Sequence, residues 1–180
     1  PILGVVEPAC AAAAQVTRNK KVGLIATAAS VRSGAYERCL SALDGDIQVY
    51  AKACPLFVPL VENGRFRPGD TVIETVAAEY LVPLRATGID TLILGCTHYP
   101  LLSEIIANIM GSGVTLVDSG AAAAQALRRE LDGRGLLSQR AHGELTLYAS
   151  DRPEDFGVLA GQFLRRPLED AVQHVDIERY

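Results

Sequence analysis

The sequence predicts an α/β protein with a mostly parallel sheet. Short apolar runs alternate along the chain with longer segments of helical period, which is typical of strands joined by right-handed helical crossovers. The run at residues 90–95, "DTLILG", is almost continuously apolar, as expected for a strand covered on both faces. The chain has 180 residues, 49% of them hydrophobic, and is long enough for one good core or two small ones.

The expected strands are short apolar runs at residues 2–6, 22–27, 46–53, 90–95, 114–119, 144–150 and 172–177. The expected helices lie at residues 8–19, 30–43, 70–85, 100–110, 120–131 and 154–164. Pro8 stands in the first turn of the first helix, where proline is tolerated. The second helix repeats apolar residues at helical spacing: Val31, Ala35, Cys39 and Leu43.

Prolines and glycines set the remaining boundaries. Residues 54–70 carry three prolines and two glycines and are expected to form a loop. Asp70 is expected to cap the helix that follows it. Pro83 is expected to kink or end that helix near Val82. Asp118 and Ser119 are expected to cap the helix that begins near Gly120.

Composition excludes several classes of function. There are 17 Lys and Arg against 21 Asp and Glu, with no basic block, so nucleic-acid binding has no support. No apolar run approaches the roughly 18 residues of a membrane helix, and no signal peptide is visible. The 4 cysteines show no C-x-x-C pair or zinc-type spacing, so neither a metal nor a disulfide scaffold is expected. A reducing cytoplasm is the expected location.

Two groups of polar residues follow expected strands, where open α/β sheets place their sites. One is Cys96, Thr97 and His98 in "LGCTHYPLL"; a thiol there would face free backbone N–H groups, which lower its pKa from about 8.5. His98 could tune it further. Buried cysteines are nevertheless commonly inert, and from the residues alone a catalytic thiol and a packed one stay equally open.

The second group is Thr27 and Ser30, whose hydroxyls could bind anionic oxygens or simply cap a helix. Glu62, before Asn63-Gly64, could be a partly buried carboxylate, but a surface turn residue is the simpler interpretation. The remaining cysteines and histidines are expected to have structural rather than catalytic roles. Cys10, Cys39 and Cys54 are assigned to packing, His142 to a surface loop and His174 to the last strand.

Together these stretches resemble the glutamate racemases of the aspartate/glutamate racemase superfamily. "LGCTHYPLL" resembles the family's second catalytic-cysteine motif, "CPLFVPLVENG" its glutamate-bearing loop and "GLIATAASVRSGAY" its Thr/Ser-rich substrate loop. "GVVEPACAAA" and "YASDRPEDFGVLAGQFL" also fit, in the same order, so the resemblance covers essentially the whole chain. Aspartate-specific relatives usually carry another residue at the place of His98, which favours glutamate as substrate.

The resemblance implies racemisation without a cofactor by two cysteines on opposite faces of glutamate, supplying D-glutamate for peptidoglycan. Cys96 would be one of the two, assisted by His98 and Glu62. Thr97, Thr27 and Ser30 would hold the carboxylates and amino group of the substrate. Ser30 stands where threonine is usual and Ala26 where glycine is usual.

The family's first cysteine lies in an Ala-Cys-Asn-Thr motif of an N-terminal half that would precede Pro1. "PACA" at Cys10 lacks the Asn-Thr, so it is no substitute for that cysteine. The family also carries an Asp-Ser-Gly motif upstream; "VDSG" at residues 117–120 resembles it but follows the second-cysteine strand, so its role is not carried over. The chain is therefore expected to represent the C-terminal two-thirds of a racemase and to be inactive alone.

By resemblance, the fold would comprise three-layer parallel-sheet racemase domains. Residues 1–117 would form a complete inserted domain, and residues 118–180 would return to a discontinuous first domain. Apolar surface is then expected beyond Asp118, to be covered by the N-terminal half or by a second copy in a homodimer. Three alternatives remain: a racemase for aspartate or another amino acid, a cysteine-nucleophile hydrolase or transferase, and a non-catalytic binding module.

Overall fold

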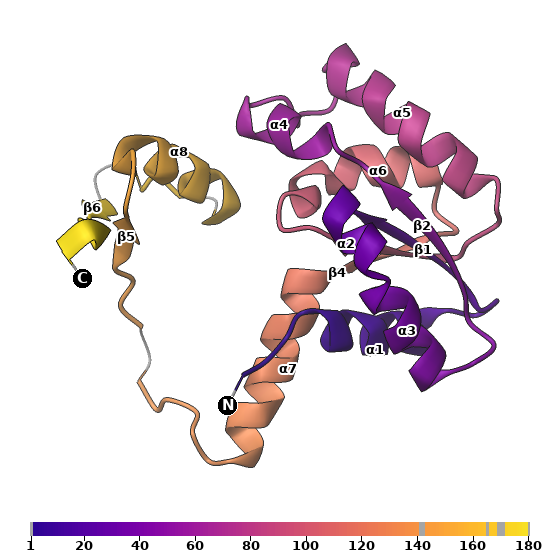
Figure 1. The fold of residues 1–180 in the computed structure, drawn as a ribbon, viewed down its shortest axis with the longest axis horizontal. Helices are drawn as coiled ribbons and strands as arrows, with labels where there is room; N and C mark the ends of the chain where they lie inside the picture. Colours follow the sequence, from indigo (N-terminus) through magenta and orange to yellow (C-terminus); the bar gives the residue numbers. More distant parts are fainter. Residues whose placement is uncertain (1, 141–142, 165, 169–171, 180) are drawn as a thin grey trace. The chain divides into compact units, whose positions relative to one another are not determined.

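The computed structural model describes residues 2–140, 143–164, 166–168 and 172–179, and the chain divides into two compact units, Pro1–Leu137 and Ser138–Tyr180. The first unit is built on a four-stranded parallel sheet, ordered β2-β1-β3-β4 (Figure 1). Its strands are β1 (Lys21–Ala26), β2 (Gln48–Ala53), β3 (Thr91–Gly95) and β4 (Thr115–Asp118). The predicted α/β class with a parallel sheet is confirmed.

Helices cover both faces of this sheet. On one face lie α4 (Phe57–Glu62), α5 (Thr71–Arg85), the 3-10 helix η1 (Tyr99–Leu102) and α6 (Ser103–Met110). On the other lie α1 (Val6–Val16), α3 (Ala35–Leu43) and α7 (Ser119–Gly133), while α2 (Ala28–Ser33) follows β1 (Figure 1).

Alternate residues of the central strands enter two different cores. Leu92 and Leu94 of β3 belong to the core under α5 and α6, whereas Ile93 belongs to the core under α1 and α3. Successive side chains of a strand point to opposite faces. Leu92, Ile93 and Leu94 are therefore all apolar because both faces of the strand are covered, as the sequence predicted.

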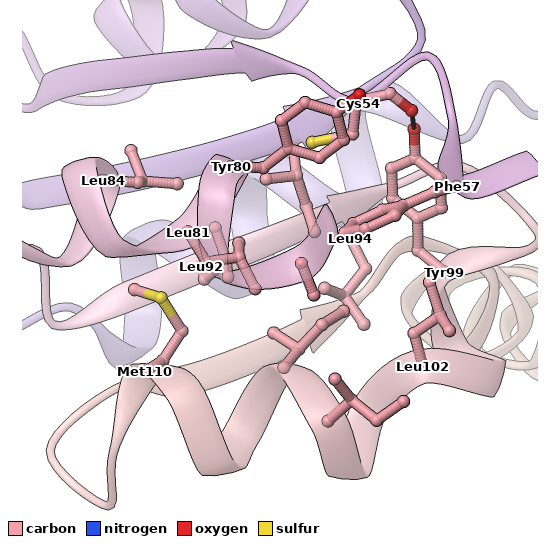
Figure 2. Packing of buried hydrophobic residues seen from close by; sticks show 14 of the residues in the cluster. Cys54, Phe57, Tyr80, Leu81, Leu84, Leu92, Leu94, Tyr99, Leu102 and Met110 are labelled. Atoms are coloured by element: carbon pink, nitrogen blue, oxygen red, sulfur yellow. Dashed lines mark hydrogen bonds between the residues drawn. The ribbon is translucent and has the colours of Figure 1, made fainter. Parts of the chain in front are cut away.

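The core under α4 and α5 contains a cluster of three aromatic rings, shown in Figure 2. Phe57 packs edge-on against Tyr99, with ring centroids 5.2 Å apart, and against Tyr80 at 5.3 Å. The Tyr99 hydroxyl donates a hydrogen bond of 3.0 Å to the Cys54 carbonyl (Figure 2). This cluster ties α4, the end of β2 and η1 together around the end of β3.

Local sequence signals explain where most helices begin. Asp70 caps α5 by accepting from the Val72 backbone N–H, and Asp118 caps α7 by accepting from Gly120 and Ala121. Both caps agree with the sequence, whereas Ser119, which was also expected to cap α7, does not, because its hydroxyl donates to the Leu94 carbonyl. Gly34, with φ of 61°, occupies the left-handed conformation that favours glycine and separates α2 from α3. The single helix expected over residues 30–43 is therefore two helices.

Two other expectations were wrong. Residues 2–5 form no strand and Val6 begins α1, because a five-residue apolar run cannot distinguish strand from helix. The expected loop at 54–70 contains α4, in whose first turn Pro59 lacks only an N–H that would have no intrahelical partner. Helix α5 matches the range expected for it, because it continues past Pro83 to Arg85 and does not end near Val82.

The second unit pairs β5 (Leu147–Ala149) with β6 (Val172–His174) in parallel, and adds α8 (Pro153–Leu164) and a 3-10 helix, η3 (Ile177–Arg179). His174 lies in β6 as expected, whereas His142 falls outside the described residues. Exposed apolar side chains are frequent in this unit: Leu145, Tyr148, Phe156, Val158, Phe163, Leu164 and Ile177. This agrees with the apolar surface expected beyond Asp118.

Helix α7 packs against α1 and so belongs to the first compact unit. The division of the chain at residue 117 into inserted and returning domains concerns a larger fold and stays a prediction. Within the described ranges, no helix has the length and apolar character needed to cross a membrane.

Candidate active site

The candidate site lies at the carboxyl ends of the parallel strands. Ala26 of β1 is in register with Gly95 of β3, so Thr27 and Cys96 each follow directly after paired residues. Asp118, the last residue of β4, pairs with Leu94, which places Ser119 at the same edge. The topology therefore brings both groups of polar residues singled out in the sequence to neighbouring strand ends.

Cys96 and His98 are in contact. The Cys96 Sγ lies 3.9 Å from the His98 Nδ1, and the same nitrogen lies 3.2 Å from the Thr97 hydroxyl. Cys96 is half-buried and is followed by a tight turn in which the Tyr99 N–H donates to the Cys96 carbonyl at 3.2 Å. The predicted helix at Pro100 opens as the 3-10 helix η1 and becomes α-helical at Ser103.

Glu62 contacts the other side of the imidazole. Its Oε1 lies 3.2 Å from the His98 Nε2, with 18% of the histidine side chain and 49% of the glutamate side chain exposed. Glu62 ends α4 and is accessible, as the simpler interpretation held, yet its carboxylate contacts the His98 imidazole. If Nε2 donates to Glu62, a neutral imidazole leaves Nδ1 as an acceptor for the Cys96 thiol or the Thr97 hydroxyl.

Thr27 and Ser30 form a compact pair of hydroxyls. Their oxygens are 3.0 Å apart, and the Thr27 Oγ1 also accepts from the Ser30 backbone N–H at 3.2 Å, capping α2. Both residues are partly exposed. Capping by Thr27 is thus shown, and the two hydroxyls remain accessible at the strand edge next to Cys96.

The other cysteines differ from Cys96 in their surroundings. Cys10 and Cys54 are fully buried, as expected. Burial raises the pKa of Cys54 to about 12 and also raises the pKa of Cys10, so both thiols stay protonated near neutral pH. Cys39 is half-buried on α3 and packs against the core under α1. Cys96 is the cysteine that lies at the strand edge beside a histidine.

A cavity of about 130 Å³ adjoins Cys96 and is lined by Val5, Tyr36, Gly95, Cys96, Thr97, Ser119 and Gly120. The sequence did not single out Tyr36, and it assigned Ser119 only to capping. The available signal was the position of Ser119 directly after a parallel strand that neighbours the Cys96 strand. Across the described ranges, no group of three or more His, Cys, Asp and Glu side chains could hold a metal ion.

Comparison with known proteins identifies the class of α/β proteins to which this fold belongs. Residues 1–127 match the Asp/Glu/Hydantoin racemase family, and the chain belongs to that family. Among its similar relatives is the glutamate racemase of Desulforudis audaxviator, 43% identical over 181 residues, which cover 96% of this chain and 65% of the relative. The family predicted from the motifs is thereby confirmed.

Solved glutamate racemases share the fold. The RacE1 isoform from Bacillus anthracis has a TM-score of 0.89 and 34% identity, covering 98% of this chain and 65% of its own. The Francisella tularensis enzyme, solved with D-glutamate, has a TM-score of 0.86 and 32% identity. The match covers 100% of this chain and 65% of that enzyme. The Thermus thermophilus enzyme, solved with β-chloro-D-alanine, has a TM-score of 0.83 and 43% identity. The match covers 100% of this chain and 64% of that enzyme. The chain thus spans about two-thirds of these relatives' length.

Proposed function

We propose that the chain contributes one catalytic face of a cofactor-independent glutamate racemase, with Cys96 as the group that exchanges a proton with the α-carbon. The observation that carries this proposal is the contact series Cys96–His98–Glu62 at the carboxyl end of β3. The similarity to glutamate racemases that span this chain from end to end supports the choice of substrate.

The chemistry requires help for a weak carbon acid. An α-proton beside a carboxylate is only weakly acidic, so a base gains little without positioning and electrostatic stabilisation. A thiolate at Cys96 would remove the proton, and a thiol there would return one. His98 would stabilise the thiolate when protonated, and the Glu62 carboxylate would stabilise that imidazolium.

Hydroxyl groups around Cys96 would hold the substrate. Thr27 and Ser30 present two oxygens 3.0 Å apart, and Thr97 presents a third next to the His98 imidazole. We propose that these groups hydrogen-bond to the carboxylates and amino group of glutamate. Aspartate, or another amino acid, is the alternative substrate within the same family.

Inversion needs an acid on the face opposite the base, and the family resemblance implies a second cysteine there. Cys10 and Cys54 are fully buried and are not proposed for that role. The chain alone is therefore expected to be inactive as a racemase, while one face of the reaction can still exchange protons. In a bacterium, the product D-glutamate would supply peptidoglycan, and the cysteine usage supports a cytoplasmic site of action.

The test is α-proton exchange of L- and D-glutamate in D₂O, followed by NMR. Exchange of one enantiomer without inversion, abolished in Cys96→Ala and retained in Cys39→Ala, would support the proposal. Cys39 is the matched control because it is also half-buried. Absence of exchange, even after the relatives' remaining third is supplied, would favour a binding module. A covalent acyl intermediate on Cys96 would favour a hydrolase or transferase.

We also propose that the apolar side chains of the second unit are covered in the functional assembly, by the remaining third of the relatives' length or by a second copy. Tyr148, Phe156 and Phe163 are 57%, 42% and 36% exposed, which is unusual for large apolar side chains in so short a unit. Sedimentation together with binding of a hydrophobic dye tests this. A single monomeric species that binds no dye would contradict it.

A further inference from the structure

Ser119 is a buried polar residue that helix capping does not explain. Buried polar or charged side chains are rare in the described parts of the chain: Asp90, Thr91 and Ser119. Ser119 is only 7% exposed and is the first residue of α7. Asp118 already caps this helix through its Oδ1, so the Ser119 hydroxyl is not needed for that purpose.

The Ser119 hydroxyl instead donates a buried hydrogen bond of 2.8 Å to the Leu94 carbonyl. Leu94 and Asp118 are the last residues paired between β3 and β4. The side chain of Ser119 therefore continues the link between the two strands beyond the point where β4 turns into α7. The anchored carbonyl belongs to the residue two positions before Cys96.

Gly95, which lies between Leu94 and Cys96, packs against the neighbouring strand β1. A Cβ on Gly95 would lie 2.9 Å from the Leu24 Cδ1 and 3.0 Å from the Ile25 carbonyl oxygen, so β1 presses directly against the backbone there. The segment leading to Cys96 is thus fixed by β1 on one side and by the Ser119 hydroxyl on the other.

Ser119 and Cys96 also line the same cavity of about 130 Å³, together with the buried Tyr36. Burial raises the pKa of Tyr36, and its interaction with the Ser119 side chain partly offsets that rise. Ser119 thus faces both the Leu94 carbonyl and the Tyr36 hydroxyl at one end of this cavity.

We propose that Ser119 is a positioning residue for Cys96: by anchoring the Leu94 carbonyl, its hydroxyl sets the end of β3 so that the thiol stays within reach of His98. This inference rests on the proposed function, because that function is what makes the position of Cys96 important. The geometry it describes is independent of the substrate. Tyr36 lines the same cavity as Ser119 and Cys96.

The experiment is a double-mutant cycle on the rate at which iodoacetamide alkylates Cys96 in the folded full chain, measured by peptide mass spectrometry across neutral pH. His98→Asn is introduced into the wild-type chain, into Ser119→Ala and into Ser103→Ala. Ser103 is the matched control because its hydroxyl also donates to a carbonyl, that of Pro100 at 2.7 Å, which lies outside β3. Circular dichroism confirms that each variant is folded.

The expected result is that the effect of His98→Asn on the alkylation rate shrinks about threefold or more in Ser119→Ala, a factor within the range of one hydrogen bond. The effect should persist in Ser103→Ala and in Ser119→Thr, which keeps the hydroxyl. An unchanged His98 effect in Ser119→Ala, or no His98 effect in the wild-type chain, would overturn the proposal.

If Ser119→Ala fails to fold, Tyr36→Phe replaces it in the cycle, because it removes only the outer hydroxyl and is expected to weaken the coupling in the same direction. Alkylation needs no glutamate. A chain that fails to exchange the α-proton of glutamate can therefore still show the coupling, and the two proposals fail separately.

Discussion

The Nε2 of His98 lies 3.2 Å from the Oε1 of Glu62, which joins the carboxyl end of α4 to the residues that follow β3. The two residues are separated by 36 positions in the chain. Each reaches the contact because the aromatic cluster of Phe57, Tyr80 and Tyr99 packs α4 against η1. The core of the fold therefore sets the geometry of the candidate site.

Glu62→Gln is expected to slow α-proton exchange about tenfold, because the amide cannot balance the charge of a protonated His98 as the carboxylate does. It should hardly change stability, since the pair is partly exposed and screened by water. The exchange rate and the thermal midpoint check both statements. Glu104→Gln, at an exposed position in α6, is the control. An exchange rate in Glu62→Gln equal to that of wild type would remove Glu62 from the mechanism.

Gly95→Ala is expected to destabilise the chain by about 1–3 kcal/mol, because overpacking forces neighbours to move. Its Cβ would meet the Leu24 Cδ1 at 2.9 Å, the Ile25 carbonyl oxygen at 3.0 Å and the Ala26 Cβ at 3.1 Å. Gly113→Ala, where nothing lies within 4 Å, should stay within about 0.5 kcal/mol of wild type. Denaturant unfolding measures both. If Gly95→Ala were as stable as Gly113→Ala, β1 would be able to move and accommodate the added methyl group at low cost.

The fold class was predictable because a strand that is buried on both faces has a nearly continuous run of apolar residues. Leu92, Ile93 and Leu94 are all apolar because both faces of β3 are covered. Asp70 and Asp118 indicated where two helices begin, because each could cap the helix that follows it. The errors came where two physical effects compete. Pro59 read as a loop signal, yet in the first turn of α4 its missing N–H has no cost, and burial of Phe57 and Val61 favours the helix.

The site was predictable only to the level of strand ends. Cys96 and Thr27 could be placed at one edge because parallel strands share it. The contact between Glu62 and His98 could not be found from spacing, since it depends on how α4 packs. Ser119 was missed for another reason: a serine after Asp118 looks like a helix cap, and only the fold shows its hydroxyl on Leu94.

Tyr99→Phe is expected to lower the free energy of unfolding by about 0.5–1.5 kcal/mol, the usual net contribution of one hydrogen bond. The lost bond is the one of 3.0 Å to the Cys54 carbonyl, which also accepts from the Phe57 N–H at 3.3 Å and so keeps a partner. Tyr50→Phe, which loses an exposed bond to Gln48, should cost less. Urea unfolding compares the two variants, and a larger loss in Tyr50→Phe would contradict this account.

Asp90 should make the chain sensitive to acid. Its carboxylate accepts hydrogen bonds from four donors in a largely buried place: the Thr17 hydroxyl at 2.7 Å, the Arg18 and Asn19 N–H groups at 2.7 and 2.8 Å, and the Thr91 hydroxyl at 2.9 Å. Burial acts to raise the pKa of Asp90, but these hydrogen bonds outweigh it, and the pKa lies below its ordinary value.

A carboxyl group whose pKa is lower in the folded chain stabilises that chain above its unfolded pKa of about 3.9, and the stabilisation is lost as pH falls through the folded value. Asp90→Asn should cost about 1–3 kcal/mol at pH 7, because the amide presents a donor to groups that themselves donate. It should also flatten the decline in stability below about pH 4.

Thermal unfolding of wild type and Asp90→Asn across that range measures the difference, with the exposed Asp46→Asn as control. If Asp90→Asn loses stability with acid as steeply as wild type, the acid sensitivity arises at other carboxylates. The hydrogen bonds around Asp90 would then contribute to folding without controlling its pH dependence.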